Sequence, residues 1–396
     1  MDVQIKKLSQ VALINPRRPS IERSDDELTS FVPMENVDDV QGEILRLNSE
    51  PYSKVKKGYT YFENGDVIFA KITPCMQNGK HAVLTGLKDG FGFGSTEFHV
   101  IRTSDEVIPE WIHFYLLRKE TLDSAMKTFT GTVGQQRVPA CFLENLEIPI
   151  LPIENQRQIA ARLKAQLAEV EKARKAAEIQ LDDVRLLRSF MLETIFSELD
   201  SAPRKKIGDK ADTTSGSTPA RGQKSYWEPA EIPWVKTAEV AFVPIIQTEE
   251  SISQKALSEC SLKLLPPKTV LVAMYGQGKT RGQSAILEIE ATTNQACFAI
   301  LPNETWEPDF LHLWFQKSYQ ELRDLSEDRG GNQANLNGAL LKAFEVPAPP
   351  KDKQNQLIRK VNSALREIKS LTDAIQTTLT DINKMPSCLL AQAFEQ

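Results

Sequence analysis

Long apolar runs are missing from this sequence. No run approaches the roughly 20 residues that a bilayer-spanning helix needs, and the first ten residues lack the apolar core of a signal peptide. The composition, with 41% hydrophobic and 26% charged residues, is that of a soluble globular protein. We therefore expect a cytoplasmic protein without membrane contact, long enough for two or three domains.

Cysteine and histidine are scarce, with five and four residues in a chain of 396. The cysteines are odd in number, scattered and never spaced as CxxC, which is typical of buried or idle thiols in a reducing compartment. The histidines form no metal-spaced cluster, and for His113 and His312, which hold matching places in the two halves, we expect a packing role. The sequence thus predicts neither a metal site nor a disulfide framework.

Enzyme motifs are missing as well. Gly276–Thr280 resembles part of a phosphate-binding loop, but that motif requires a glycine at the position that Ala273 holds. No GxGxxG sequence follows a strand pattern, and Asn15-Pro16 is followed by arginines instead of the proline–aromatic pair of an adenine methyltransferase. We expect no catalytic residues and no cofactor bound by this chain. An NTPase that uses Gly276–Thr280 stays an alternative, which calorimetry with nucleotides tests.

What the sequence does have is a long helical pattern, present twice. Between Ile153 and Ala202 there is no glycine or proline, and apolar residues, Leu187 among them, recur every three or four positions. Such a helix is about 65 Å long at 1.5 Å per residue, and its narrow apolar stripe is typical of a coiled-coil seam. A second stretch, 351–396, repeats the plan. The seam residues that we expect to be packed are Ile159, Leu163, Val170, Leu181, Val184, Leu357, Val361, Ile368, Ile375 and Ile382.

The two helical stretches are copies in register. Gln156 and Gln354 are 198 positions apart, and so are Phe196 and Phe394, in a chain of twice that length. The chain is therefore a tandem repeat of one unit, and we expect the two helices to pack against each other.

Each copy opens with a region of mixed helix and strand patterns. In the first region, strand patterns occupy 31–34, 66–72, 82–84 and 97–101, and a helix pattern occupies 109–118. Val67–Ala70 matches Val270–Ala273 at an offset of 203, and Pro109 matches Pro308 at 199, so the scaffold is shared while the loops differ. One scaffold with different loops suits two binding specificities. The predicted segments are a first domain, 1–150, a central helix, 151–200, a second domain, 201–348, and a C-terminal helix, 349–396.

Acidic residues are absent from four windows of an otherwise acidic chain with a net charge of −5: 67–88, 124–143, 261–287 and 329–344. The windows fall at corresponding places in the two halves. Because neither domain is basic overall, a nucleic-acid surface would be local or completed by a partner. Ordinary polar loops are the alternative, but polar residues on glycine-rich loops also suit base edges and phosphates. The DNA-contact candidates in these windows are Lys71, Thr73, Gln77, Asn78, Lys80, Thr130, Thr132, Gln135, Arg137, Gln277, Lys279, Arg281, Asn332, Gln333 and Asn335.

Short motifs in a fixed order make the chain resemble the specificity (S) subunit of a type I restriction–modification system. They are Pro149–Pro152 with Glu154–Gln156, Pro347–Pro350 with Gln354, Thr214–Pro219 leading to Tyr226-Trp227, Ile232–Val235, Thr293–Gln295 and Gly330–Gln333. The first half departs most, since 11–24 lacks the Ser-Thr-Pro turn. The resemblance covers nearly the whole chain and implies an α+β fold: two pseudo-repeated mixed α/β target-recognition domains joined by two long helices packed as an antiparallel coiled coil. It adds Ser217, Thr218, Arg221, Lys236, Asn294 and Gln295 to the DNA-contact candidates.

The resemblance also implies a non-catalytic role. Each domain would read one half of a split, asymmetric site in double-stranded DNA, and the helices would dock methyltransferase subunits, two of them, that carry S-adenosylmethionine. A motor-nuclease restriction subunit would join with ATP and Mg. Two alternatives stay open: a DNA-specificity subunit of a related modification or phage-defence complex that is not type I, and a coiled-coil scaffold without a DNA role.

Overall fold

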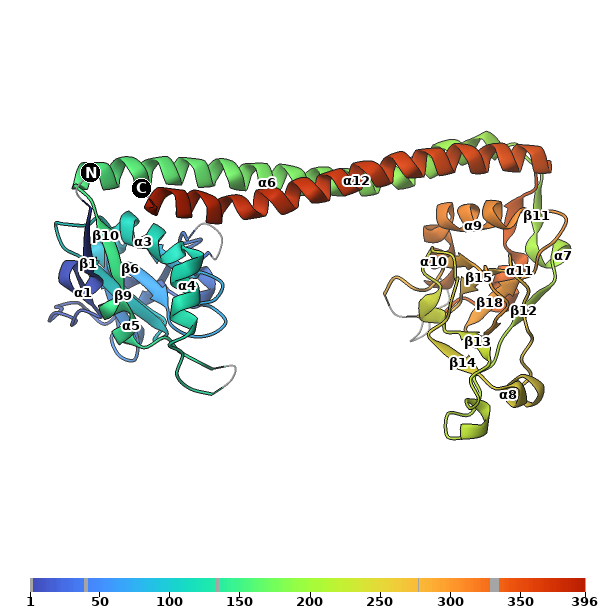
Figure 1. The fold of residues 1–396 in the computed structure, drawn as a ribbon, viewed down its shortest axis with the longest axis horizontal. Helices are drawn as coiled ribbons and strands as arrows, with labels where there is room; N and C mark the ends of the chain where they lie inside the picture. Colours follow the sequence, from blue (N-terminus) through green and yellow to red (C-terminus); the bar gives the residue numbers. More distant parts are fainter. Residues whose placement is uncertain (1–2, 39–41, 133–134, 277, 328–334, 396) are drawn as a thin grey trace. The chain divides into compact units, whose positions relative to one another are not determined.

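The computed structural model describes residues 3–38, 42–132, 135–276, 278–327 and 335–395. Internal contacts divide the chain into two units, Met1–Ile179 with Gln376–Gln396 (unit 1) and Gln180–Ile375 (unit 2). Each unit holds one globular domain, one part of α6 (Ile153–Phe196) and one part of α12 (Lys351–Phe394), as Figure 1 shows. The segments predicted from the sequence differ from these two units in that they list the two long helices separately from the globular domains. Within the described residues, no helix is both long and apolar enough to cross a membrane.

The first domain contains two four-stranded sheets and a small two-stranded one. The first sheet has the order β2 (Ala12–Ile14), β9 (Phe98–Thr103), β6 (Val67–Ala70) and β7 (His81–Val83). The second has the order β4 (Asn48–Pro51), β3 (Leu28–Val32), β8 (Phe91–Gly94) and β5 (Thr60–Glu63), with β3 and β8 parallel. Strand β1 (Gln4–Lys7) pairs with β10 (Glu147–Ile150). The helices are α1 (Leu8–Val11), α2 (Tyr52–Val55), α3 (Pro109–Leu117), α4 (Lys119–Met126) and α5 (Ala140–Asn145).

The second domain repeats this plan. One sheet has the order β12 (Thr213–Ser215), β18 (Cys297–Ile300), β15 (Val270–Ala273) and β16 (Ser284–Ile286). The other has the order β14 (Glu250–Ile252), β13 (Ile232–Val235) and β17 (Thr292–Thr293), and β11 (Arg204–Lys206) pairs with β19 (Glu345–Pro347). The helices are α7 (Ile207–Lys210), α8 (Gln254–Glu259), α9 (Pro308–Lys317), α10 (Tyr319–Glu327) and α11 (Gly338–Ala343). The predicted fold class is thereby confirmed.

The strand patterns of the first domain locate β3, β6, β7 and β9, with errors at their ends. The predicted strand 31–34 is β3, which begins at Leu28 and ends at Val32. Pro33 follows, and because proline has no amide hydrogen the ladder stops there and a 3-10 turn begins at Met34. The predicted helix 109–118 is α3, which ends one residue earlier, at Leu117.

The repeated glutamines of the helix motifs tie each domain to its helix. Gln156 is fully buried; its Oε1 accepts from the amide of Ile108 (3.0 Å), and its Nε2 donates to the carbonyls of Glu106 (2.9 Å) and Leu151 (2.7 Å). Gln354 does the same in unit 2. Such a side chain satisfies three backbone groups at a buried helix start, where an unpaired group is costly.

Aromatic and aliphatic side chains complete the contact between domains and helices. In unit 1, Phe114 of α3 packs in one cluster with Leu163 of α6 and Leu390 of α12. In unit 2, Phe196 of α6 contacts Phe310 and Trp314 of α9 edge to face, with ring centroids 5.8 and 5.4 Å apart.

The predicted seam residues are all removed from water to some degree. Six of them are buried, namely Leu163, Val184, Leu357, Val361, Ile375 and Ile382. The other four are partly buried, namely Ile159, Val170, Leu181 and Ile368. Leu187, expected on the same stripe, is instead 45% exposed, because the buried face of α6 turns toward Leu192 and Phe196 at this end. With Leu186 (70% exposed) and Phe190 (69% exposed), Leu187 forms an exposed apolar patch, hereafter the α6 patch.

Candidate nucleic-acid interface

Several candidate loops of the second domain meet at one edge of its sheets. Strands β13 and β17 are parallel, with Val235 opposite Thr293, so Lys236 and Asn294 follow them at the same edge. The amide of Ser217 donates to the carbonyl of Thr293 (3.0 Å), which brings the loop after β12 to that edge. The amide of Met274 donates to the carbonyl of Ala296 (2.9 Å) and adds the loop after β15.

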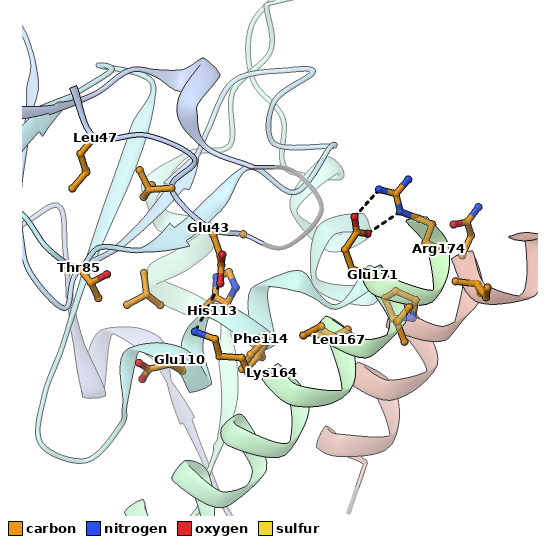
Figure 2. A pocket seen from close by; sticks show the side chains of 18 residues that line it. Glu43, Leu47, Thr85, Glu110, His113, Phe114, Lys164, Leu167, Glu171 and Arg174 are labelled. Atoms are coloured by element: carbon orange, nitrogen blue, oxygen red, sulfur yellow. Dashed lines mark hydrogen bonds and ion pairs between the residues drawn. The ribbon is translucent and has the colours of Figure 1, made fainter. Parts of the chain in front are cut away.

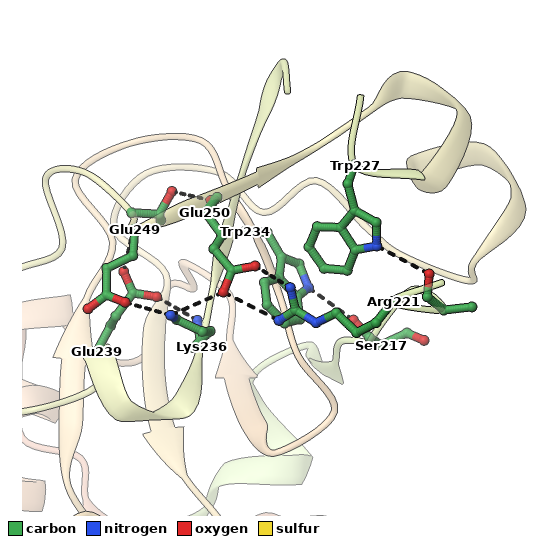
Figure 3. A network of polar contacts seen from close by, with 10 residues as sticks. Ser217, Arg221, Trp227, Trp234, Lys236, Glu239, Glu249 and Glu250 are labelled. Atoms are coloured by element: carbon green, nitrogen blue, oxygen red, sulfur yellow. Dashed lines mark hydrogen bonds and ion pairs between the residues drawn. The ribbon is translucent and has the colours of Figure 1, made fainter. Parts of the chain in front are cut away.

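At this edge the side chain of Arg221 stacks on two tryptophan rings (Figure 3). The Arg221 guanidinium carbon lies 4.0 Å from the centroid of the Trp227 ring and 5.1 Å from that of Trp234. Glu250 accepts hydrogen bonds from the same guanidinium and pairs with Lys236 (3.1 Å). The Arg221 guanidinium holds the pKa of Glu250 below its usual range.

Two further carboxylates surround Lys236. Its Nζ lies 2.5 Å from a Glu249 oxygen, and the hydrogen bond to Glu249 is the main reason why the pKa of Lys236 is raised. Glu239 accepts from the backbone amides of Lys236 (2.6 Å) and Glu249 (3.0 Å). The edge network, defined as Arg221, Lys236, Glu239, Glu249 and Glu250, thus combines two cations with three carboxylates.

The Ser-Gly-Ser-Thr-Pro turn is shaped by one close approach. A Cβ on Gly216 would lie 1.7 Å from the carbonyl oxygen of Thr293, so no larger residue fits there. The turn places the Thr218 hydroxyl on the side-chain oxygen of Gln295. Asn294 faces inward, where its Oδ1 accepts from the Thr237 hydroxyl (2.8 Å). Of this group, Thr218 and Gln295 are exposed.

The DNA-contact candidates in and near the loop after β15 differ in their exposure to solvent. Lys279 is exposed, and its carbonyl accepts from the hydroxyl of Tyr319 (2.6 Å). Arg281 is only 8% exposed, which places its side chain in the interior and not at the surface that we expected. Asn335 is exposed, whereas Gln277, Asn332 and Gln333 lie outside the described residues.

The first domain brings its candidates together at the corresponding edge. The amide of Lys71 donates to the carbonyl of Glu97, and the amide of Thr73 donates to that of Gln136, both at 2.9 Å. Arg137 binds the Glu97 carboxylate through two hydrogen bonds (2.9 and 2.7 Å), and this pairing lowers the pKa of Glu97. The exposed candidates here are Gln77, Asn78, Thr130, Thr132 and Gln135.

Lys80 has an internal role instead. Its Nζ donates to the backbone carbonyls of Val37 (2.7 Å) and Met34 (3.4 Å) and so braces the segment after β3. A lysine engaged in this way is a poor candidate for a phosphate contact.

Sequence reasoning missed Arg18. It stands on the connection between β2 and β3, as Arg221 stands between β12 and β13, and its guanidinium lies 5.0 Å from the Phe93 ring. It also donates to the Tyr52 hydroxyl and to the Lys56 carbonyl (2.5 Å). The two domains thus share an arginine stacked on an aromatic ring of the second sheet. Arg18 stands four residues after the end of β2, a strand that the sequence patterns did not predict, so no signal pointed to it.

The arrangement gathers polar side chains and backbone groups at one edge of each domain. Over the described part of the chain, no three His, Cys, Asp or Glu side chains gather as a metal site requires. The exposed polar side chains of the edges can form hydrogen bonds to another molecule.

The family profile described as "Type I restriction modification DNA specificity domain" matches residues 1–181 and 203–380. The specificity subunit of the type I restriction enzyme EcoAI of Escherichia coli is 36% identical over 190 residues, which are 48% of this chain and 32% of that protein. The MjaIX specificity subunit of Methanocaldococcus jannaschii is 33% identical over 179 residues, 42% of this chain and 40% of that protein. The chain therefore matches about a third to two-fifths of the length of these relatives.

Solved structures share the fold over the whole chain. The HsdS subunit from Thermoanaerobacter tengcongensis matches with a TM-score of 0.67 and 19% identity, covering 99% of this chain and 96% of that one. A chain from a type I R-M system, studied for complex assembly and conformational transition, matches with a TM-score of 0.79 and 19% identity, covering 99% and 97%.

Proposed function

We propose a DNA-reading function from one premise, that the chain belongs to the family of type I restriction–modification DNA specificity proteins. In this function the chain is the non-catalytic specificity subunit, and each domain reads one half of a split site in double-stranded DNA. The observation that carries the proposal is the edge of the second domain, where four loops and a stacked arginine converge. Because the corresponding edge of the first domain carries different side chains, the two half-sites differ and the site is asymmetric.

The edge network favours base edges over phosphates. Two cations and three carboxylates leave it with a net negative charge, which repels a phosphate, whereas guanidinium and carboxylate groups both pair with base edges. Exposed Lys279, which has no acidic neighbour within the window 261–287, is the better candidate for a phosphate contact.

The α6 patch is the surface that we assign to a methyltransferase subunit. Leu186 and Phe190 lie one helical turn apart, so they share a face, and apolar side chains this exposed are typical of a protein interface. Two such subunits, each with S-adenosylmethionine, would supply the methylation chemistry, and a restriction subunit with ATP and Mg would supply cleavage. The alternative, a related complex that is not type I, is distinguished by which enzymes co-purify with the chain.

The test uses the chain assembled with its methyltransferase subunits. We expect Arg221→Ala to relax the sequence of one half-site, with a loss of about 1–3 kcal/mol for the cognate site and an unchanged salt dependence. Lys279→Ala should weaken all sequences alike and reduce the slope of log K against log salt by about 1. Lys205→Ala, an exposed lysine on β11, is the matched control.

Mapping of methylated bases together with binding at several salt concentrations measures both effects. An Arg221→Ala complex that methylates the original sequence with the original affinity contradicts the assignment of this edge. The chain without its partners should transfer no methyl group and cleave no DNA.

A further inference from the structure

The α6 patch of unit 2 has a counterpart on α12 in unit 1. The offset of 198 assigns its three positions, in order, to Lys384, Met385 and Cys388, all of which are exposed. These three residues are hereafter the α12 face. The chain thus presents two surfaces at equivalent places of its two units, and the surfaces can be compared residue by residue.

Both surfaces lie on the same side of their helices. Leu192 and Leu390, an identical pair 198 positions apart, are each 4% exposed and pack on the globular domain of their own unit. Ser189 and Ser387, a second identical pair, are both exposed. Because the two helices bury the same side and expose the same side, one kind of partner can approach both surfaces.

The two surfaces differ most in apolar character. In the α6 patch, Leu186 is 70% exposed and Phe190 is 69% exposed. The α12 face has a lysine and a cysteine at these two positions, and only Met385, 46% exposed, keeps a large apolar side chain. A few large side chains carry most of the binding energy of a protein interface, so the α12 face should bind an apolar partner surface much more weakly.

An aspartate stands three residues before each surface, and the two aspartates differ in their pairing. Asp381 accepts a hydrogen bond from the ammonium of Lys384 (3.0 Å). Asp183 has leucine three residues later and, among the described residues, no ion-pair partner. Residues three and four apart share a helix face, so a carboxylate borders the α6 patch and can pair with a cation of the partner. Such an exposed pair orients a partner more than it adds affinity.

In unit 2 the globular domain holds the segment of α6 that carries the patch. The guanidinium of Arg188 donates to the side-chain oxygen of Gln316 on α9 (2.6 Å). One turn further along α6, Glu193 pairs with Lys317 of α9 (3.3 Å). Side chains on a segment that is fixed in this way lose less freedom when a partner binds.

The corresponding segment of α12 in unit 1 lacks both ties. Pro386 stands at the position of Arg188, and Ala391 stands at that of Glu193. Proline has no amide hydrogen, so α12 supplies no donor to the carbonyl of Ile382, four residues earlier. Ile382 and Pro386 also line a cavity of about 740 Å³ between the first domain and the helices (Figure 2). This stretch of α12 therefore borders open volume where α6 is tied to its domain.

We propose that the chain binds its two methyltransferase subunits with unequal affinity. The first docks on the α6 patch, and the second docks on the α12 face at least a hundredfold more weakly. Two large apolar side chains are missing from the α12 face, and each is expected to contribute about tenfold in affinity, which corresponds to 1.4 kcal/mol. The partner surface that fits is apolar, with a basic side chain at the end that meets Asp183. This inference rests on the proposed function, in which a methyltransferase subunit is the partner.

The first experiment titrates the full chain with the methyltransferase subunit that co-purifies with it. Native mass spectrometry and sedimentation velocity, over a range of concentrations, measure the two dissociation constants separately. We expect a one-to-one complex first, and a complex with two methyltransferase subunits only at concentrations at least a hundredfold higher. Two equal dissociation constants would overturn the inference.

Paired substitutions exchange the two surfaces. Lys384→Leu with Cys388→Phe gives the α12 face the residues of the α6 patch and should tighten the second binding step at least tenfold. Leu186→Lys with Phe190→Cys makes the reverse change and should weaken the first step to the level of the second. Asp183→Asn should weaken only the first step, by a few-fold.

The matched control is Arg157→Leu. Arg157 is an exposed cation that pairs with Glu154, three residues earlier (3.7 Å), so the change removes a similar pair and adds a leucine outside both surfaces. Both dissociation constants should stay unchanged, and the melting temperatures of all variants should match that of the parent chain, because every substituted side chain is exposed.

The outcomes separate this inference from the function on which it rests. If no methyltransferase subunit co-purifies with the chain, the proposed function and the inference are overturned together. If two subunits bind but Lys384→Leu with Cys388→Phe leaves the second step unchanged, the function stands and the inference alone is wrong.

Discussion

Replacing Gln354 by leucine should release the second domain from the helix that carries it. The Gln354 side chain is fully buried; its Oε1 accepts from the amide of Glu307 (2.8 Å). Its Nε2 donates to the carbonyls of Thr305 (2.8 Å) and Pro349 (2.9 Å). Leucine fills a similar volume, so the change removes three hydrogen bonds with little loss of packing.

The magnitude follows from the three backbone groups that lose their partner. A buried group left unpaired costs about 1–3 kcal/mol, and partial access of water places these three near the lower limit, so we expect a loss of about 3–5 kcal/mol. With a urea m value of about 3 kcal/mol per molar, the unfolding midpoint of unit 2 should fall by about 1–1.7 M. The loss of stability should be confined to unit 2, because in unit 1 Gln156 forms the equivalent three hydrogen bonds, which the substitution does not change.

The chain offers a matched control in Gln356, the other glutamine of the same repeat, whose side chain is exposed. Urea unfolding monitored by tryptophan fluorescence should show a change within about 0.5 kcal/mol for Gln356→Leu. If Gln354→Leu unfolds at the same urea concentration as Gln356→Leu, the buried hydrogen bonds do not hold the domain to the helix, and the argument fails.

Three further outcomes can be measured directly. Burial lowers the pKa of His81 to about 4, below the 6.5 of the unfolded chain, so the unfolded state binds the proton first and stability should fall by about 2 kcal/mol between pH 7 and pH 5. His81→Ser should flatten that part of the curve of urea midpoint against pH. Gly216→Ala should lower the melting temperature and impair recognition of the second half-site, whereas Gly222→Ala, with open space around its Cβ, should do neither. Leu186→Glu should abolish co-purification of a methyltransferase subunit while the chain's own melting temperature stays unchanged.

Periodic features could be read from the sequence, because they repeat the same physical demand many times. The two long helices follow from unbroken apolar spacing, and their pairing follows from the offset that relates Gln156 to Gln354. The seam prediction erred at Leu187, because the helix there packs on its own globular domain through Phe196, and a stripe drawn for helix pairing does not include that contact.

Single side chains on loops could not be read in the same way. Arg281 and Lys279 stand in the same acid-free window, yet only the first is buried, because burial depends on how α10 packs against the loop. Arg18 escaped notice since its stacking partner Phe93 is 75 positions away in the sequence. The absence of acids in a loop supports the prediction of a DNA contact there, but only the fold decides which side chains reach the surface of the loop.

The repeat also predicts the oligomeric state of a fragment of residues 1–200. In unit 1, Phe394 packs on Trp111 (4.5 Å between centroids) and on Tyr115 (5.2 Å), and Leu390 packs beside Leu163. The fragment lacks both α12 residues. A second copy of the fragment offers the same residue types at the same spacing, since Phe196 and Leu192 stand 198 positions before them.

We therefore expect the fragment to form a symmetric dimer in which each copy's α6 covers the other's domain. Arg188 would then occupy the position of Pro386 in unit 1. With a methyltransferase subunit, the two identical domains should direct methylation to an inverted repeat. Phe196→Asp should keep the fragment monomeric, because it would bury an unpaired carboxylate against Trp111. Mass measurement and methylation mapping decide the matter: a monomeric parent fragment, or a methylated site that stays asymmetric, would show that the two helices are not interchangeable.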